Sequence, residues 1–237
     1  MMVISPRSLR LHAPFAVREA MVAVCHALAT RQLIAGQDGN VSVKIGTDRV
    51  LVTPSGFAKG AIDADDLVEV SMSGAQIGGR NRPSSELGLH LAAYAARPDV
   101  GAVVHAHPPC ATAFTLVGET IPDGVLAELM LSVGPVALAP YEHPGTEQLG
   151  KSVAPFLAAH DVVLLAHHGA LAVGRTLRDA HFAMESLEHG AQMIHLARQL
   201  GRVVTLDSAA CDALRATRRR ERIDAAQRAA LKENTND

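Results

Sequence analysis

The sequence predicts an α/β protein, because segments with the apolar period of helices are interspersed with short continuous apolar runs typical of buried strands. The clearest helix is expected over 176–200, and the clearest strands over 101–105 and 162–165. With 237 residues, 48% hydrophobic and 19% charged, the chain has the length and composition of one globular domain with a sizeable core. We therefore expect a single domain over 1–237, with a charged C-terminal tail from about residue 215.

The N-terminal part predicts one helix followed by a β-hairpin. Apolar residues recur at helical spacing over 14–35, and Gly36 is expected to end that helix. Gly39-Asn40 reads as a turn, after which alternating apolar and polar residues over 41–52 predict two antiparallel strands. Residues 53–56, Thr-Pro-Ser-Gly, end the second strand.

A second helix is expected after Pro83-Ser84-Ser85-Glu86, with Ser84 as its N-cap and Arg97-Pro98 at its end. The strand over 101–104 leads directly to His105, and the strand over 162–165 leads to His167-His168-Gly169. Both strands would therefore deliver histidines at their ends. From Arg215 onward the charge density predicts a solvated helix.

Composition also excludes several classes of partner and environment. A net charge of -2 and a pI near 6.6 give no overall attraction to nucleic acid or to an anionic membrane. The N-terminus has no apolar signal segment, and no run of about 20 apolar residues occurs, so a cytoplasmic protein is expected. Cys25, Cys110 and Cys211 are widely spaced and predict reduced thiols.

Twelve histidines are many for this length, and three of them form a candidate metal site. In His105-Ala106-His107, residues i and i+2 of a strand end point to the same side and can bind one ion together. His168 would complete a set of three protein ligands that leaves one position open for substrate, as in catalytic zinc sites. Taken alone, the H-x-H pair favours ordinary polar residues at a strand end, and it is the combination with the neighbouring motifs that favours a metal site.

Glu86 is the carboxylate expected beside this ion, as a ligand or as a proton carrier. The alternative is an acidic residue placed only to favour the start of its helix. Backbone amides and hydroxyls in three segments could bind a phosphate group, although each pair is also typical of a plain turn. These segments are Gly39-Asn40, Ser55-Gly56 and Ser84-Ser85.

A competing cluster lies on the long helix, where four side chains recur at spacings of three to four residues: His181, Glu185, Glu188 and His189. It lacks the H-E-x-x-H order of a specific metal motif, so a packed or solvated helix face is expected. Cys110, three residues after His107, is interpreted as a small buried residue rather than a thiolate ligand.

Six landmarks in order resemble the class II aldolase/adducin family over about residues 17–200, and within it are most similar to the L-fuculose-1-phosphate and deoxypentulose-phosphate aldolases. They are Gly39-Asn40-Val41-Ser42, Thr53-Pro54-Ser55-Gly56, Pro83-Ser84-Ser85-Glu86, His105-Ala106-His107-Pro108, Ala139-Pro140-Tyr141 and His167-His168-Gly169. The resemblance implies a three-layer α/β/α sandwich around a largely antiparallel sheet. It also implies a homotetramer with active sites at subunit interfaces.

Residue by residue, the resemblance implies that three histidines are zinc ligands and that Glu86 is the acid/base group. The three turn segments would form the phosphate pocket. Tyr141 would reach a neighbouring subunit's site and handle the proton on the aldehyde oxygen, although a packed tyrosine with a hydrogen-bonded hydroxyl fits the sequence equally well. The implied zinc ligands are His105, His107 and His168.

The implied activity is that of an aldehyde-lyase of carbohydrate metabolism, which cleaves a ketose 1-phosphate to dihydroxyacetone phosphate and an aldehyde. Mn²⁺, Co²⁺ or Fe²⁺ could occupy the same ligands. The departures are His167, where the family often has Asn, and the lack of a tyrosine in the C-terminal tail. The alternatives are a sugar-phosphate dehydratase, a decarboxylase, a 4-epimerase and a non-catalytic adducin-like assembly module. The decarboxylases often have Lys at the position of Glu86, and the sequence of 128–135 disfavours the 4-epimerase.

Overall fold

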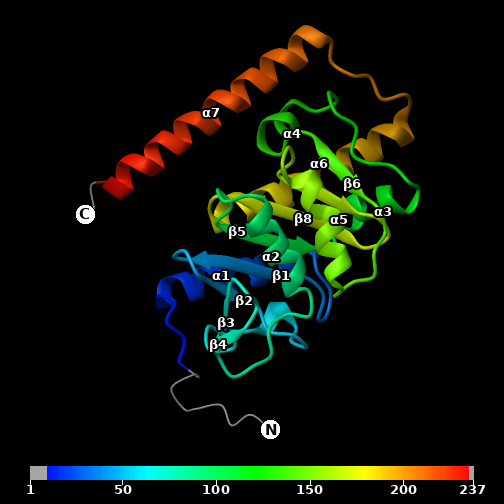
Figure 1. The fold of residues 1–237 in the computed structure, drawn as a ribbon. Helices are drawn as coiled ribbons and strands as arrows, with labels where there is room; N and C mark the ends of the chain where they lie inside the picture. The colour runs from blue at the N-terminus through cyan, green and yellow to red at the C-terminus, as the bar shows by residue number, and fades with distance from the viewer. Residues whose placement is uncertain (1–9, 235–237) are drawn as a thin grey trace.

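A computed structural model describes residues 10–234, and in this range one mixed sheet of eight strands runs through the protein. Its order is β4-β3-β2-β1-β5-β8-β7-β6, which runs from the bottom to the top of Figure 1. Every neighbouring pair is antiparallel except β6 and β7, which are parallel. The strands are β1 (Asn40–Ile45), β2 (Arg49–Val52), β3 (Val68–Ser71), β4 (Gln76–Gly78), β5 (Ala102–Ala106), β6 (Val136–Ala139), β7 (Val162–Leu165) and β8 (Gly169–Gly174).

Helices cover both faces of this sheet, so the expected three-layer α/β/α sandwich is confirmed. Successive residues of β5 belong to two different apolar clusters: Val103 contributes to the one beneath α2 and α5, and Val104 to the one beneath α1, α3 and α6. Because side chains alternate across a strand, a strand buried on both faces reads as a continuous apolar run. The helices are α1 (Phe15–Thr30), α2 (Leu87–Ala96), α3 (Pro109–Leu116), α4 (Ala127–Ser132), α5 (Glu147–Leu157), α6 (Leu177–Leu200) and α7 (Ser208–Asn234).

Two predicted helix boundaries are wrong. The first helix ends at Thr30 rather than near Gly36, because Gln32 adopts a left-handed φ of 59° and the amide of Leu33 closes the helix end on the carbonyl of Leu28. Leu33 is thereby buried against the core. Likewise, Ser84 is not the N-cap of α2: the helix begins at Leu87 with Glu86 in the N-cap position.

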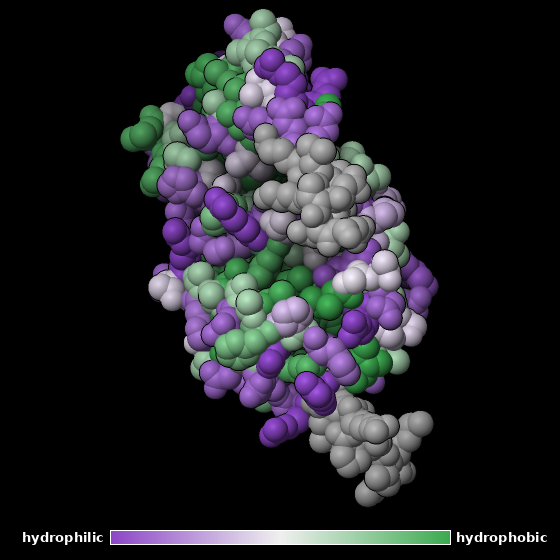
Figure 2. All heavy atoms as spheres, turned by 90° about the vertical axis from the view of Figure 1, so that its left-hand side faces the viewer, coloured by the Kyte–Doolittle hydropathy of each residue, from purple (hydrophilic) through white to green (hydrophobic). Residues whose placement is uncertain are grey.

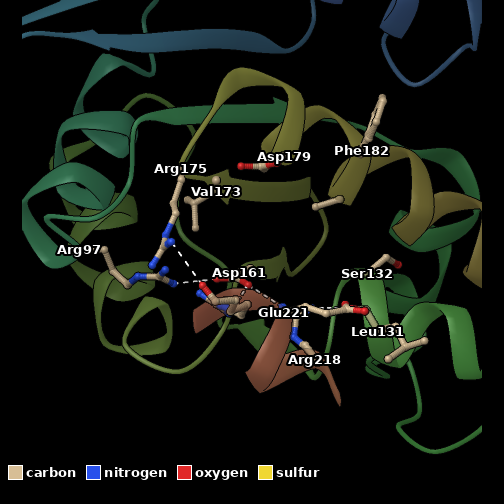
Figure 3. A pocket seen from close by; sticks show the side chains of 13 residues that line it. Arg97, Leu131, Ser132, Asp161, Val173, Arg175, Asp179, Phe182, Arg218 and Glu221 are labelled. Carbon is tan, nitrogen blue, oxygen red and sulfur yellow. Dashed lines mark hydrogen bonds and ion pairs between the residues drawn. The ribbon is translucent and has the colours of Figure 1, made fainter. Parts of the chain in front are cut away.

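The charged C-terminal segment forms the predicted helix, α7, which runs along the top of Figure 1. Its first half is held to the domain by Asp161, which lies just before β7. Asp161 accepts from Arg97 at 2.8 Å and from Arg218 and Arg222 of α7 at 2.5 Å each. Figure 3 shows Arg97 and Arg218 approaching this carboxylate from different sides of a cavity of about 280 Å³.

We expect Asp161→Asn to lower the free energy of unfolding by about 3 kcal/mol, because it leaves partly buried guanidinium groups without their shared counter-charge. Limited proteolysis should then remove α7 faster than in the wild-type protein. The control is Asp212→Asn, which changes an exposed partner of Arg215 on the same helix and should leave α7 docked. Equal protease sensitivity of both variants would exclude Asp161 as the anchor.

The surface is mixed in character. On the face that lies to the left in Figure 1, hydrophilic and hydrophobic side chains are interspersed, as Figure 2 shows. Among residues 10–234, no helix combines the length and the apolarity needed to cross a membrane.

Candidate metal centre

The topology brings the predicted ligands to one end of the sheet. Strand β5 leads to His105 and His107 there, and the β7–β8 hairpin turns back at the same end, because Ala106 of β5 pairs with Ala170 of β8. His168 lies in that hairpin turn. Strand β1 starts at this end too, with Asn40 directly opposite His105. Residues more than 60 positions apart therefore meet here.

The three imidazole rings face one another. Their centroids lie 4.8 to 5.0 Å apart, and one nitrogen from each ring lies within 4.8 Å of the others. The Nε2 atoms of His105 and His107 are 3.2 Å apart. Nitrogen ligands at about 2.0–2.1 Å from a tetrahedral ion are themselves about 3.3 Å apart. The structure thus brings the three predicted histidines together, and the distance between the Nε2 atoms of His105 and His107 suits a shared ion.

Hydrogen bonds outside the cluster turn the Nε2 atoms of two rings inward. His105 Nδ1 donates to the carbonyl oxygen of Ala170 at 2.9 Å, so Nε2 is the nitrogen that faces Glu86 and the other rings. His107 Nδ1 lies 3.4 Å from a carboxylate oxygen of Asp38, which orients that ring in the same way. A bound ion would use the lone pairs of these two Nε2 atoms in place of protons.

Glu86 adds its carboxylate to this group of lone pairs. Its Oε2 lies 3.1 Å from His105 Nε2, and its Oε1 lies 3.4 Å from His168 Nε2. Oε1 is buried and has no hydrogen-bond partner among the described residues. Three converging imidazole nitrogens and an unpartnered carboxylate oxygen are a set of groups that fits a divalent cation.

Glu86 stays ionised in this environment. Burial by itself would raise its pKa, but the hydrogen bond and positive charge of His105, with the amide of Asn40, lower the pKa below the usual carboxylate range. The amide nitrogen of Asn40 donates to Oε2 at 2.9 Å. The group is therefore available as a ligand or a base at neutral pH.

Two of the imidazoles are held in the neutral form that binds metal. Burial and then the positive charge of His105 lower the pKa of His168 to about 4. The same two causes lower the pKa of His107. At neutral pH these rings therefore need not lose a proton before they coordinate an ion.

Two glycines permit the backbone to pass this close to the ligands. A Cβ at Gly39, whose φ is 70°, would lie 2.5 Å from the Ile34 side chain and 2.9 Å from the carbonyl oxygen of His105. A Cβ at Gly169 would lie 2.6 Å from the ring of His107. Larger residues at either position would displace the clustered histidines.

Comparison with known proteins identifies the fold that carries this centre. Residues 19–195 match the sequence model of the class II aldolase and adducin N-terminal domain. The chain belongs to the class II aldolase/adducin family. Class II aldolases depend on a metal ion, and the described part of this chain contains a histidine cluster that could bind one.

Several relatives of this class II aldolase-family chain have assigned activities. A 3-oxo-tetronate 4-phosphate decarboxylase of Pectobacterium atrosepticum is 34% identical over 76% of this chain and 84% of its own length. A 5-methylthioribulose-1-phosphate/5-deoxyribulose-1-phosphate aldolase of Rhodospirillum rubrum is 36% identical over 70% of this chain and 74% of its own. A solved L-fuculose 1-phosphate aldolase superposes with a TM-score of 0.81 at 29% identity, covering 86% of this chain and 97% of that one.

The turns predicted to bind phosphate lie in the same region. Lys59, a nearly buried residue, donates to the carbonyl oxygens of Gln37 and Phe57 at 2.7 and 2.8 Å. It thereby ties the turn before Asn40 to the turn that contains Ser55 and Gly56. Ser84 is buried, and its hydroxyl accepts from the amide of Glu86 at 3.2 Å.

Tyr141 and His167 lie beside the centre rather than in it. The Tyr141 side chain is exposed, and its ring centroid is 6.5 Å from that of His167. His167 adopts a left-handed φ of 55° in the β7–β8 turn, a conformation that Asn tolerates better. The departure at this position thus affects the hairpin turn and not the ligand set.

In the competing cluster on α6, Glu188 and Glu185 contact other parts of the protein. Glu188 is buried and accepts from the first amides of α3, those of Cys110 and Ala111, at 3.0 and 2.9 Å. It therefore caps the helix that follows His107. Glu185 pairs with Arg31 at 2.6 Å and with His181 at 3.3 Å.

Sequence reasoning missed Asp38 and Lys59 and did not foresee the contact that Glu188 makes. Asp38 could have been suspected from its place in the turn before Asn40. Nothing in the sequence connects Glu188 with α3, because that contact spans 78 residues.

Proposed function

We propose that this chain is a metal-dependent aldehyde-lyase that cleaves the C3–C4 bond of a ketose 1-phosphate and yields dihydroxyacetone phosphate and an aldehyde. The observation that carries the proposal is the Glu86 carboxylate, buried and ionised, within 3.4 Å of two of the three converging imidazoles. A proton carrier beside a cation site suits the formation and quenching of a carbanion next to a carbonyl.

We propose zinc as the resident ion, held by His105, His107 and His168, with Mn²⁺, Co²⁺ or Fe²⁺ able to use the same ligands. When bound, the ion would polarise the substrate carbonyl and stabilise negative charge on its oxygen. Glu86 would be a further ligand while substrate is absent. It would become the proton carrier once a chelating ketose takes its place.

The chain's own groups supply the remaining steps. In the cleavage direction, the C3–C4 electron pair remains on C3 and the C4 oxygen loses its proton as the aldehyde carbonyl forms. Glu86 takes up a proton from solvent and delivers it to C3, and in the reverse reaction it removes that proton. Tyr141, supplied by a neighbouring subunit of a homotetramer, relays the proton of the C4 oxygen to solvent, so that one proton is gained and one is lost. The phosphate would bind at Gly39-Asn40, Ser55-Gly56 and Ser84-Ser85.

Decarboxylation is the second candidate, favoured by the 34% identity to the Pectobacterium decarboxylase. Loss of carbon dioxide from a 3-oxo acid leaves the electron pair on C2, beside the C3 carbonyl. With 3-oxo-tetronate 4-phosphate, protonation of C2 would again give dihydroxyacetone phosphate. Both reactions therefore require the same step from Glu86, which is proton transfer at the carbon next to the carbonyl.

Phosphorus NMR of the metal-loaded protein would separate the candidates. The test substrates are 5-deoxyribulose 1-phosphate, L-fuculose 1-phosphate and 3-oxo-tetronate 4-phosphate. We expect dihydroxyacetone phosphate from at least one ketose 1-phosphate, together with an aldehyde that is trapped separately. If dihydroxyacetone phosphate appears only from 3-oxo-tetronate 4-phosphate, with release of carbon dioxide, the protein is a decarboxylase. Conversion of none of the three, with no metal retained, would favour the assembly module.

A further inference from the structure

We infer that His90 is a positioning residue, which holds the Asn40 amide, and through it the Glu86 carboxylate, in one orientation at the metal centre. The inference rests on the proposed role of Glu86. It is carried by a buried chain of side-chain hydrogen bonds that the reaction itself does not use.

The chain connects one face of α2 with one face of β1. Glu86, His90 and Tyr94 recur every four residues along the start and body of α2, and Asn40 and Ser42 are alternate residues of β1. From the metal centre inward, Asn40 Nδ2 lies 2.9 Å from Glu86 Oε2, and Asn40 Oδ1 contacts His90 Nε2. His90 Nδ1 lies 2.7 Å from Ser42 Oγ, which lies 2.8 Å from the hydroxyl oxygen of Tyr94.

The orientation of the Asn40 amide fixes the direction of every bond in this chain. Its NH₂ group donates to Glu86 Oε2, and its carbonyl oxygen faces His90 Nε2. His90 must then donate from Nε2, which leaves Nδ1 as an acceptor for the Ser42 hydroxyl. Ser42 in turn accepts from Tyr94. All donors therefore point toward Glu86.

The burial of this chain makes the orientation matter. His90 and Ser42 are completely buried, and Tyr94 is nearly so. Burial, and then the charge of His105, lower the pKa of His90 to about 3, so the ring stays neutral with a single N–H to place. If that N–H did not bind the Asn40 carbonyl, the amide could rotate and turn its oxygen toward the carboxylate, where two acceptors would repel.

Two substitutions of His90 distinguish its role in orienting the Asn40 amide from its contribution to core packing. The amide nitrogen of Gln occupies the place of the histidine Nε2, so His90→Gln can still donate to Asn40. The amide of Asn reaches only the place of Nδ1, so His90→Asn keeps a partner for Ser42 but loses the contact with Asn40. Both variants remove ring volume and one hydrogen bond, so we expect both to lose stability.

For His90→Asn we expect kcat to fall by about 10- to 100-fold, the usual effect of losing a partner that orients a metal-site group. KM and metal content should stay nearly unchanged. His90→Gln should keep kcat within about threefold of the wild type, although it is destabilised as well. Tyr94→Phe is the matched control at the end of the hydrogen-bond chain away from Glu86. Ser42 can still donate to His90 in this variant, so its stability should fall while its kcat stays near that of the wild type. Equal losses of kcat in both His90 variants would overturn the inference.

A measurement independent of turnover tests the same chain in the metal-loaded protein. With ¹⁵N-labelled histidine, and His90→Gln for the assignment, NMR should find His90 protonated at Nε2 and unprotonated at Nδ1. A proton on Nδ1 would reverse the chain and overturn the inference. Should the wild type convert none of the proposed substrates while the Nε2 tautomer is found, the proposed activity fails but the hydrogen-bond chain stands.

Discussion

Replacing Glu86 by glutamine should lower turnover by about 10²- to 10⁴-fold, the usual contribution of a positioned acid/base group. Glutamine has the same shape and can still accept from Asn40, but its amide cannot carry a proton to or from carbon. The three imidazoles are untouched, so bound metal should remain. Steady-state kinetics with the substrate identified by phosphorus NMR, together with metal analysis of the purified variant, measure both effects.

The control for this variant is Glu147→Gln, which changes an exposed glutamate of α5 that pairs with Lys151. It should leave both turnover and metal content as in the wild type. Full activity in Glu86→Gln would remove Glu86 from the chemistry. If Glu86→Gln lost the metal together with activity, Glu86 would act as a metal ligand and not as the proton carrier.

Replacing His168 by asparagine should weaken metal binding by at least about 100-fold, more than the loss of an outer-shell partner costs, and abolish turnover. The matched control is His167→Asn, one residue earlier in the same turn, where the ring lies outside the cluster and asparagine suits the left-handed φ. That variant should keep its metal. Atomic absorption and competition with a fluorescent chelator measure the difference.

Thermal unfolding gives a second readout for the same pair. An ion that binds only the folded state stabilises it, so a chelator should lower the Tm of the wild type and of His167→Asn. It should leave the Tm of His168→Asn unchanged. If both variants responded equally to the chelator, the ion would bind elsewhere in the protein.

Much of the fold could be predicted from local patterns. The buried strands β5 and β7 are continuous apolar runs, and the capping box of α6, in which Thr176 and Asp179 exchange hydrogen bonds, marks its start. The end of α1 could not be predicted, because burial of Leu33 overrides the stop expected at Gly36. The short helix α3 shows weak apolar periodicity, and Glu188, which accepts from its first amides, is 77 and 78 residues away in the sequence.

The ligand set could be predicted because its geometry is partly local. His105 and His107 point to one side through strand periodicity, and both His107 and His168 follow apolar strands. The groups that tune those ligands lie beyond local patterns. The contact of Asn40 with Glu86 spans 46 residues and that of Ser42 with His90 spans 48, so only the pairing of β1 with α2 brings them together.

The most direct test of the central claim, that Glu86 beside a histidine-bound cation moves a proton at the carbon next to a carbonyl, needs no aldehyde partner. When dihydroxyacetone phosphate is incubated with the metal-loaded protein in D₂O, one of its C3 hydrogens should exchange for deuterium. Proton NMR measures this exchange. Chelator treatment and Glu86→Gln should each abolish the exchange. Absence of exchange in the metal-loaded wild type, or undiminished exchange in Glu86→Gln, would contradict the claim.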